Sequence, residues 1–404
     1  MMSNLYITAD QVGIQTGGGV VTFNESEAMK VLGPCEVWGR EQLPTGGHVV
    51  GGLHPSAYNE PWGWDLHAYE KLHLPRTESF RLAHFYAGTF STTVDRLRRS
   101  GCKVTYTAAA HDVQASRRAH EELGVPFNYL HLTDPKLWER YVRGYLEADV
   151  LICPSTHSAN VMRGFGATNR IEIIPHGCSL PECNLCHGTK VVFEGNRHLP
   201  EDDPGYSWEH PCPVCEGTGI APITPLPPQF RLGYLGSYGA DKSVVTLLKA
   251  WKKLNYSDAV LVLGGRDSNS QWTHALLQHC DYPRNVVLTG WVDDVSTFYN
   301  SISCYCQPSL TEGFGIEVLE AMVYGRAVIC STGAGAVDLL EFGMTFPAGD
   351  VDALAQQIHL CHTNWKLGGT AFPQMGRTNR LLAERYTWPK IRKRYMDLWR
   401  ELLS

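Results

Sequence analysis

The sequence lacks any apolar run that approaches the roughly 20 residues needed to cross a bilayer as a helix. Its first ten residues lack the basic stretch followed by a long apolar segment that marks a signal peptide, and we expect them to form a first strand instead. The balance of charge is also modest, because 35 Lys and Arg against 41 Asp and Glu leave a net charge of −6. We therefore expect a cytoplasmic protein without a transmembrane segment.

Basic residues are scarce in the middle of the chain, where residues 181–228 carry seven acidic and two basic side chains. A segment of this charge is unsuited to grip the phosphates of a nucleic acid. A basic cluster occurs earlier, formed by Arg96, Arg98, Arg99 and Lys103. Such a run is most often a solvated helix face, although contact with a nucleic acid or with the surface of a membrane stays open.

Strand-like and helix-like segments alternate on both sides of one irregular stretch, and 404 residues are too many for a single ordinary core. Such alternation favours parallel sheets that are covered on both faces. We predict an α/β protein with two Rossmann-like domains that face each other across a cleft, with the ligand at the carboxyl ends of the strands. The predicted divisions are a first domain over residues 1–177, an insertion over 178–228, a second domain over 229–385 and a closing helix over 386–404.

The densest chemical signal lies where a strand ends near Gln307 and a helix begins near Gly315. The loop between them carries Glu312 and Gly313, and Glu320 falls in the second turn of the helix. Glycines let a ligand approach the backbone, and free N–H groups at a helix start attract anions, so a diphosphate would fit here. Taken alone, such a segment is more often an ordinary strand, loop and helix with solvated carboxylates.

Several segments together resemble the retaining glycosyltransferase family 4, whose members have the two-domain GT-B fold. The spacing of Glu312 and Glu320 resembles the E-x7-E signature of that family. In the family, the segment similar to residues 384–388 starts a C-terminal helix that crosses back to the first domain. The segments that resemble family motifs are residues 17–19, 107–112, 174–177, 235–243, 288–292, 312–320 and 384–388.

The resemblance implies roles residue by residue. Glu320 would hold the ribose hydroxyls of the nucleotide, Glu312 would hold hydroxyls of the transferred sugar, and Lys242 would neutralise the diphosphate leaving group. His111 would face the sugar near the reacting carbon, and it completes the predicted catalytic set with Glu312 and Lys242. The predicted donor-binding residues are Gly17, Gly18, Gly19, Gly236, Lys242, Val292, Gly313, Phe314, Gly315, Ile316 and Glu320.

One position departs from the family pattern, because Ser237 stands where the family usually has Arg. Part of the cationic support for the leaving group is then missing, or it comes from another residue such as Arg266. The sequence has no D-x-D motif in a suitable loop and no convincing carboxylate nucleophile. The usual account for the family is front-face transfer with retention, which needs no protein nucleophile. We therefore expect catalysis by pre-placed cations, helix amides and domain closure, without a divalent metal.

A second strong pattern is a pair of C-x-x-C knuckles, Cys183 with Cys186 and Cys212 with Cys215. Four thiolates complete a tetrahedral structural zinc site, whereas a redox pair or free thiols are the alternatives. Both knuckles resemble the C-x-x-C-x-G-x-G unit of DnaJ chaperone zinc modules, although Lys190 replaces the last glycine of the first. We expect a structural zinc ion, because this segment has almost no apolar core to fold around.

The predicted function is retaining transfer of a hexosyl or pentosyl group from a nucleotide-diphosphate sugar to an acceptor hydroxyl. The acceptor is a saccharide, a lipid-linked molecule or a small molecule, and the sequence does not identify it. Two alternatives stay open: transfer to a hydroxymethylated base in DNA, and a non-catalytic nucleotide-sugar-binding scaffold. The joint presence of His111, Lys242, Glu312 and Glu320 speaks against a decayed site.

Overall fold

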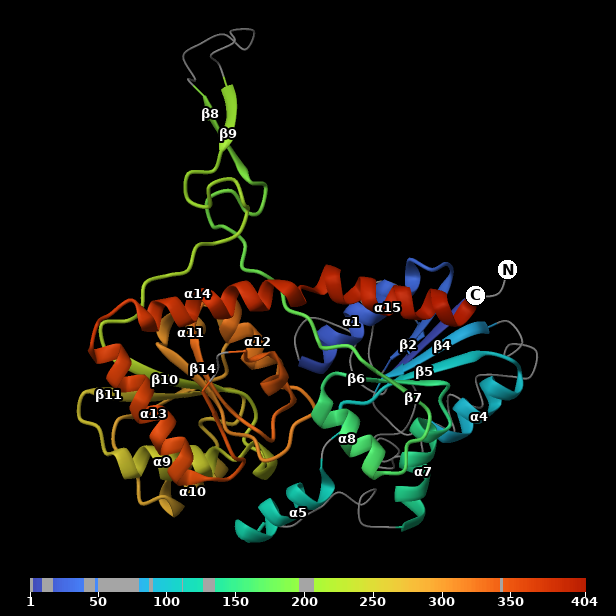
Figure 1. The fold of residues 1–404 in the computed structure, drawn as a ribbon, viewed down its shortest axis with the longest axis horizontal. Coiled ribbons are helices and arrows are strands. Elements are labelled where there is room, and N and C mark those ends of the chain that lie inside the picture. Colours follow the sequence, from blue (N-terminus) through green and yellow to red (C-terminus); the bar gives the residue numbers. More distant parts are fainter. Residues whose placement is uncertain are drawn as a thin grey trace.

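Two parallel β-sheets, each covered by helices, form the two halves of this computed structural model (Figure 1). The prediction of an α/β fold with two Rossmann-like domains is confirmed. A two-stranded hairpin lies between the sheets in the sequence. The structure describes residues 3–8, 17–39, 48–49, 80–86, 90–110, 112–125, 135–195, 207–341 and 344–404.

The first sheet has seven parallel strands in the order β3-β2-β1-β4-β5-β6-β7. Its central strands are buried along almost their whole length, because both faces of a parallel sheet are covered. The strands are β1 (Ser3–Thr8), β2 (Cys35–Gly39), β3 (His48–Val49), β4 (Phe80–Tyr86), β5 (Lys103–Thr107), β6 (Val150–Cys153) and β7 (Arg170–Ile173). The helices of this half are α1 (Gly17–Lys30), α4 (Ser91–Arg99), α5 (Val113–Glu122), α7 (Pro135–Leu146) and α8 (Thr156–Gly164).

The second sheet has six parallel strands in the order β12-β11-β10-β13-β14-β15. The strands are β10 (Phe230–Leu235), β11 (Ala259–Gly264), β12 (Val286–Gly290), β13 (Cys304–Gln307), β14 (Ala327–Ser331) and β15 (Met344–Phe346). The helices are η2 (Ala240–Lys242), α9 (Val244–Leu254), α10 (Gln271–His279), α11 (Val295–Ser301), α12 (Ile316–Val323), η3 (Gly335–Leu339), α13 (Val351–Lys366), α14 (Ala371–Ala383), η4 (Glu384–Tyr386) and α15 (Trp388–Leu403). None of the described helices is long and apolar enough to span a membrane.

The connection between the halves runs through Cys178 and the start of α15. Cys178 pairs with Thr387 in a parallel bridge, and the Trp388 N–H donates to the Cys178 carbonyl at 3.1 Å. Gly177 has no room for a side chain, because a Cβ there would lie 2.7 Å from the Trp388 ring. The helix α15 then packs against α1 of the first half (Figure 1).

A buried carboxylate fixes α15 to the first sheet. The Glu25 side chain on α1 is 1% exposed and accepts hydrogen bonds from Tyr395 at 2.6 Å, Tyr6 at 2.8 Å and Thr107 at 2.8 Å. The Nε2 of His84 lies 3.2 Å from the same carboxylate. Burial raises the pKa of Glu25, but the His84 charge and these hydrogen bonds outweigh it and hold the pKa below its ordinary value.

Replacing Tyr395 with Phe should lower the free energy of unfolding by about 2 kcal/mol, because buried Glu25 loses a charge-assisted hydrogen bond. Urea unfolding at neutral pH measures the change. The pKa of Glu25 is depressed in the fold, so this contribution is present above the ordinary glutamate value of 4.5 and should be lost as the pH falls through the lower folded value. The control is Tyr256→Phe, which removes a hydroxyl that contacts His359 at 2.9 Å near the surface. Equal losses in the two variants would contradict the assigned role of Glu25.

Candidate active site

The loop between β13 and α12 is fixed by backbone hydrogen bonds to the next strand connection. The Glu312 N–H donates to the Gly333 carbonyl at 2.9 Å, and the Gly335 N–H donates to the Glu312 carbonyl at 3.0 Å. Gly315 caps α12 with a φ of 95°, a left-handed conformation that favours glycine. The helix α12 therefore begins just after the loop that carries Glu312. The N–H groups at a helix start attract anions.

Lys242 and Glu312 form an ion pair at the centre of the candidate site, with side chains that are 17% and 9% exposed. Lys242 ends η2, and its Nζ donates to Oε1 of Glu312. The other oxygen of Glu312 accepts from Gln307 Nε2 at 2.6 Å and from Ser309 Oγ at 2.8 Å. Burial lowers the pKa of Lys242, but the carboxylates of Glu312 and Glu317 outweigh it and raise the pKa above its ordinary value. Lys242 is therefore a permanent cation that can meet phosphate oxygens.

Two more carboxylates lie on α12 behind this pair. Burial and the Glu312 charge raise the pKa of Glu317, whose Oε2 is buried without a hydrogen bond among the described residues. Burial and the Glu317 charge raise the pKa of Glu320 to about 7, and the Tyr299 hydroxyl donates to Glu320 at 2.8 Å. No role was predicted for Glu317, although its spacing of three from Glu320 puts both on one helix face.

We expect Glu320→Gln to flatten the dependence of stability on pH. Between pH 4.5 and about 7 the unfolded Glu320 releases its proton and the folded one keeps it, so stability falls as the pH rises. The total fall is about 3 kcal/mol at roughly 1.4 kcal/mol per pKa unit. Urea unfolding at a series of pH values measures it, and Glu341→Gln, at an exposed carboxylate, serves as the control. An unchanged slope in Glu320→Gln would show that Glu320 ionises freely in the fold.

The first half of the chain contacts the Glu312 loop directly. The Ser155 hydroxyl donates to the Gly313 carbonyl at 2.6 Å, and the Asp112 N–H donates to Thr311 Oγ1 at 2.7 Å. A Cβ at Gly313 would lie 2.7 Å from the Ala109 carbonyl carbon, so this glycine permits the close approach. These contacts bring the segment around Asp112, from the end of the first sheet, against the loop that carries Glu312.

A further contact joins the start of α8 to the second half. Ser155 caps α8, and the Thr156 N–H donates to the Asp338 carboxylate of η3 at 2.7 Å. The His157 ring lies 3.3 Å from Thr311 Oγ1. None of these partners was predicted from the sequence, because each joins residues more than 150 positions apart.

The remaining predicted residues are spread over both halves. Gly17, Gly18 and Gly19 form the first turn of α1. His111 lies outside the described residues. Val292 and Ile316 are partly buried against the core around α12, which includes Phe314.

Phe314 packs between the candidate site and the segment that links the two halves. Its ring packs edge-on against His176 at 5.1 Å, and both side chains are buried. Burial lowers the pKa of His176 to about 4, so its ring is neutral at ordinary pH.

The glycine-rich turn after β10 also lies near the carboxylates. A Cβ at Gly236 would lie 3.0 Å from the Tyr234 hydroxyl and 3.8 Å from Glu317 Oε1. Ser237, at the position where the family that the sequence resembles usually has Arg, accepts a hydrogen bond from Tyr234 through its carbonyl. Arg266 is exposed, with its guanidinium 5.5 Å from the centre of the Trp291 ring. Whether Arg266 supports the leaving group stays a prediction.

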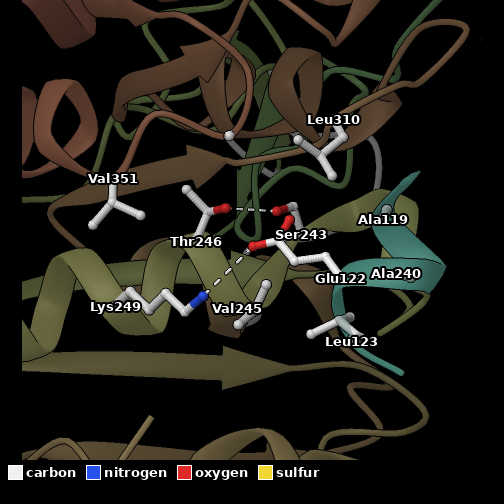
Figure 2. A pocket seen from close by; sticks show the side chains of 11 residues that line it. Ala119, Glu122, Leu123, Ala240, Ser243, Val245, Thr246, Lys249, Leu310 and Val351 are labelled. Carbon is white, nitrogen blue, oxygen red and sulfur yellow. Dashed lines mark hydrogen bonds and ion pairs between the residues drawn. The ribbon is translucent and has the colours of Figure 1, made fainter. Parts of the chain in front are cut away.

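A small cavity lies in the seam between α5 and α9, and its lining includes Ala240 and Ser243 on either side of Lys242 (Figure 2). The Lys249 ammonium lies 3.7 Å from the Glu122 carboxylate across this seam. The side chains of Ser243 and Thr246 contact each other at 2.7 Å. The cavity measures about 40 Å³, which admits a water molecule and not a nucleotide.

The four knuckle cysteines converge on one point. Their sulfur atoms lie within 4.8 Å of one another and all four side chains are buried. The Sγ atoms of Cys183 and Cys212 are 3.7 Å apart, and those of Cys186 and Cys215 are 3.6 Å apart. A tetrahedral zinc ion with Zn–S bonds of about 2.3 Å would separate its sulfur ligands by about 3.8 Å. The Gly219 N–H also donates to Cys215 Sγ at 3.2 Å, as suits a thiolate ligand.

Comparison with solved structures defines the class of fold. Sucrose-phosphate synthase from Thermosynechococcus elongatus has a TM-score of 0.70 and 16% identity, with 99% of each chain covered. Anabaena Alr3699/HepE, solved in complex with UDP, has a TM-score of 0.62 and 15% identity, with 99% of this chain and 100% of that chain covered. The two Rossmann-like halves therefore have the GT-B fold.

Sequence comparison matches a family model to part of the second half. Residues 229–364 match the family model for glycosyl transferases group 1, and they form a domain of that type. An uncharacterised glycosyltransferase from Haemophilus influenzae is 30% identical over 178 residues, which are 43% of this chain and 47% of the relative. The chain thus spans about half the length of this curated relative.

Proposed function

We propose that the chain is a retaining glycosyltransferase that moves a sugar from a nucleoside-diphosphate donor to an acceptor hydroxyl. The observation that carries the proposal is the ion pair of Lys242 and Glu312, with Glu317 and Glu320 on the helix that follows, within the group 1 domain. A largely buried cation next to carboxylates suits a ligand with both phosphate and hydroxyl groups.

Each charged group takes one part of the donor. The Lys242 ammonium meets the diphosphate, and it can leave Glu312 for the phosphate oxygens because both are anionic acceptors. Glu312 then accepts hydrogen bonds from hydroxyls of the transferred sugar, and Glu320 accepts them from the ribose. Gly18 and Gly19 offer helix-start N–H groups to the phosphates from the first domain, and His111 faces the sugar.

The reaction exchanges one bond at the anomeric carbon. The bond to the diphosphate oxygen breaks, the acceptor oxygen bonds to the same face, and the acceptor proton passes to the departing phosphate. Negative charge grows on the diphosphate, and the Lys242 ammonium and the α12 amides stabilise that charge. The contacts of Ser155 and Asp112 with the Glu312 loop hold the two halves together and exclude water.

A uridine diphosphate sugar is the first donor to test, because Anabaena Alr3699/HepE has this fold and was solved with UDP. The acceptor is a saccharide, a lipid-linked molecule or a small molecule. No described feature favours a hydroxymethylated DNA base as the acceptor. No described feature favours a non-catalytic scaffold either, since Lys242, Glu312 and Glu320 are all in place.

A zinc ion held by the four cysteines is the proposed structural cofactor, because their sulfur spacing is close to that of a tetrahedral site. The ion would fold a segment that has little apolar core of its own. No protein-bound divalent metal is proposed for the transfer step. All thirteen cysteines are unpaired, which supports a reducing compartment such as the cytoplasm.

Mass spectrometry of the purified protein tests the proposal. Ligands released on denaturation should include a nucleoside diphosphate or its sugar conjugate. Incubation with UDP-sugars and other nucleotide sugars should then release nucleoside diphosphate from one of them, faster with the correct acceptor. The proposal fails if no nucleotide sugar either binds or is consumed by protein shown to be folded.

A further inference from the structure

The knuckle and hairpin stand away from both halves on the side where α14 and α15 run (Figure 1). We call residues 181–195 and 207–220 the cysteine arm. Its strands β8 (Val191–Gly195) and β9 (Ser207–Pro211) pair only with each other in the described structure, and they form a two-stranded sheet. A lone two-stranded hairpin is marginally stable in water. The arm therefore has open strand edges that a partner can cover.

The surface of the arm combines apolar and acidic side chains. Leu185 is 49% exposed and Val214 is 45% exposed, and they occupy equivalent places in the two C-x-x-C knuckles. Glu182 and Glu216, next to the knuckles, are exposed as well. The arm as defined contains four acidic residues and one Lys, so its net charge is −3. A partner surface should therefore be basic with an apolar element.

The two helices α14 and α15 present such a surface on the same molecule. Residues 371–404 contain eight Lys and Arg and three Asp and Glu, which gives a net charge of +5. Leu381 on α14 is 65% exposed among these charges. Arg377 bonds to the Gln374 amide at 2.9 Å, and Lys390 bonds to a backbone carbonyl at 2.8 Å. In these contacts both cations meet neutral oxygens and keep their charge available.

The arm and these helices lie on one side of the molecule. The root of the arm touches α14, because Arg380 donates to the Ala221 carbonyl at 2.9 Å. The arm then continues outward (Figure 1). A two-fold axis that faces this side toward a second copy would place each arm on the helices of the other copy. Such an isologous contact is the commonest form of oligomer interface.

We propose that this side of the molecule is a homodimer interface, in which the cysteine arm of each copy lies along α14 and α15 of the other. A second copy satisfies both surfaces at once. In the dimer the arm of each copy, with a net charge of −3, meets the helices of the other copy, with a net charge of +5. A nucleic acid or an anionic lipid would suit the helices but would be repelled by the arm. Exposed Leu185, Val214 and Leu381 supply the apolar contact that charge alone lacks.

The test is the mass of the full chain in solution by sedimentation equilibrium. At low salt and about 10 micromolar protein, the expected species has twice the 45.0 kDa of one chain. Raising the salt to about 0.5 M should weaken the dimer, because exposed charges are then screened. A single species of 45.0 kDa at every concentration would overturn the proposal.

Charge reversal identifies the contact. Glu182→Lys with Glu216→Lys should raise the dissociation constant at least about tenfold, and so should Arg377→Glu with Lys390→Glu. The chain with all four changes should recover part of the dimer, because the new lysines of the arm then meet the new glutamates of the helices at the reversed positions. Lys252→Glu with Lys253→Glu on α9 is the matched control and should dimerise as the parent does. Reversed arms that still dimerise, or a fourfold variant that does not recover, would reject this interface.

None of these charges belongs to the donor site, so each variant should consume donor sugar at the parental rate. Failure of the dimer and failure of the proposed activity are therefore separate results.

Discussion

Replacing Lys242 with Ala should lower the kcat of sugar transfer by about a thousandfold, which is the usual effect of removing one charge that stabilises a transition state. The leaving diphosphate gains negative charge as its bond to the sugar breaks, and Lys242 is the cation that pairs with Glu312 at the site. Its pKa is raised by Glu312 and Glu317 despite burial, so the charge is present throughout the ordinary pH range. The measurement is steady-state release of nucleoside diphosphate and of glycosylated acceptor.

The split between KM and kcat distinguishes catalysis from simple donor binding. An interaction that strengthens in the transition state affects kcat, whereas uniform binding affects only KM. Lys249→Ala is the matched control, because Lys249 pairs with Glu122 in the seam outside the site. Lys242→Arg should recover part of the rate, since it restores charge but not the shape of the ammonium. A Lys242→Ala variant that keeps its kcat would remove this lysine from the mechanism.

The stability of the Lys242→Ala variant must be measured beside its activity. Removing the lysine leaves Glu312 close to buried Glu317 without its cation, and like charges in a buried site repel. One of the two carboxylates should then take up a proton, so the loss of stability should be largest above neutral pH. Thermal unfolding at two pH values separates this effect from the loss of catalysis.

Both sheets could be predicted from sequence because strand–helix alternation is a local pattern. The helix α14 was not predicted, since it contains Pro373 and Gly376 in its first two turns. Tertiary packing explains Gly376, because a Cβ there would lie 2.1 Å from the Gly325 carbonyl oxygen. The hairpin in the cysteine arm was not predicted either, because its short strands have no alternation of apolar and polar residues.

In the candidate site, too, some contacts could be predicted from local sequence and others could not. Gln307, Ser309 and Glu312 are close in sequence, so one motif contains both the carboxylate and its hydrogen-bond donors. Lys242 reaches Glu312 across 70 positions, and only a family resemblance could connect them in advance. The contact of Ser155 with Gly313 joins two domains, and no periodicity or motif encodes it.

Replacing Cys212 with Ser should abolish zinc binding, reducing the metal content from about one ion per chain to none. Zinc binding to such a site contributes about 10 to 16 kcal/mol in small zinc domains, because the metal binding energy is also folding energy. Among the described residues the buried apolar cluster of the knuckle consists of the four cysteines themselves, so the metal rather than an apolar core would hold it together. Metal analysis by mass spectrometry measures the loss, and Cys35→Ser, at a thiol of the first half that packs against the core around α1 and α15, is the control.

The loss of zinc should unfold the cysteine arm and leave both sheets intact. The arm joins the body through its root, where Arg380 bonds to Ala221, and neither sheet includes its strands. Limited proteolysis should therefore cut Cys212→Ser within residues 178–228, whereas the thermal unfolding of the two halves changes little. The dimer should dissociate while donor consumption continues, because the arm carries the dimer contact and no donor-site residue. Loss of both zinc and donor consumption would instead mean that the knuckle supports the connection between the halves, next to Cys178 and Thr387.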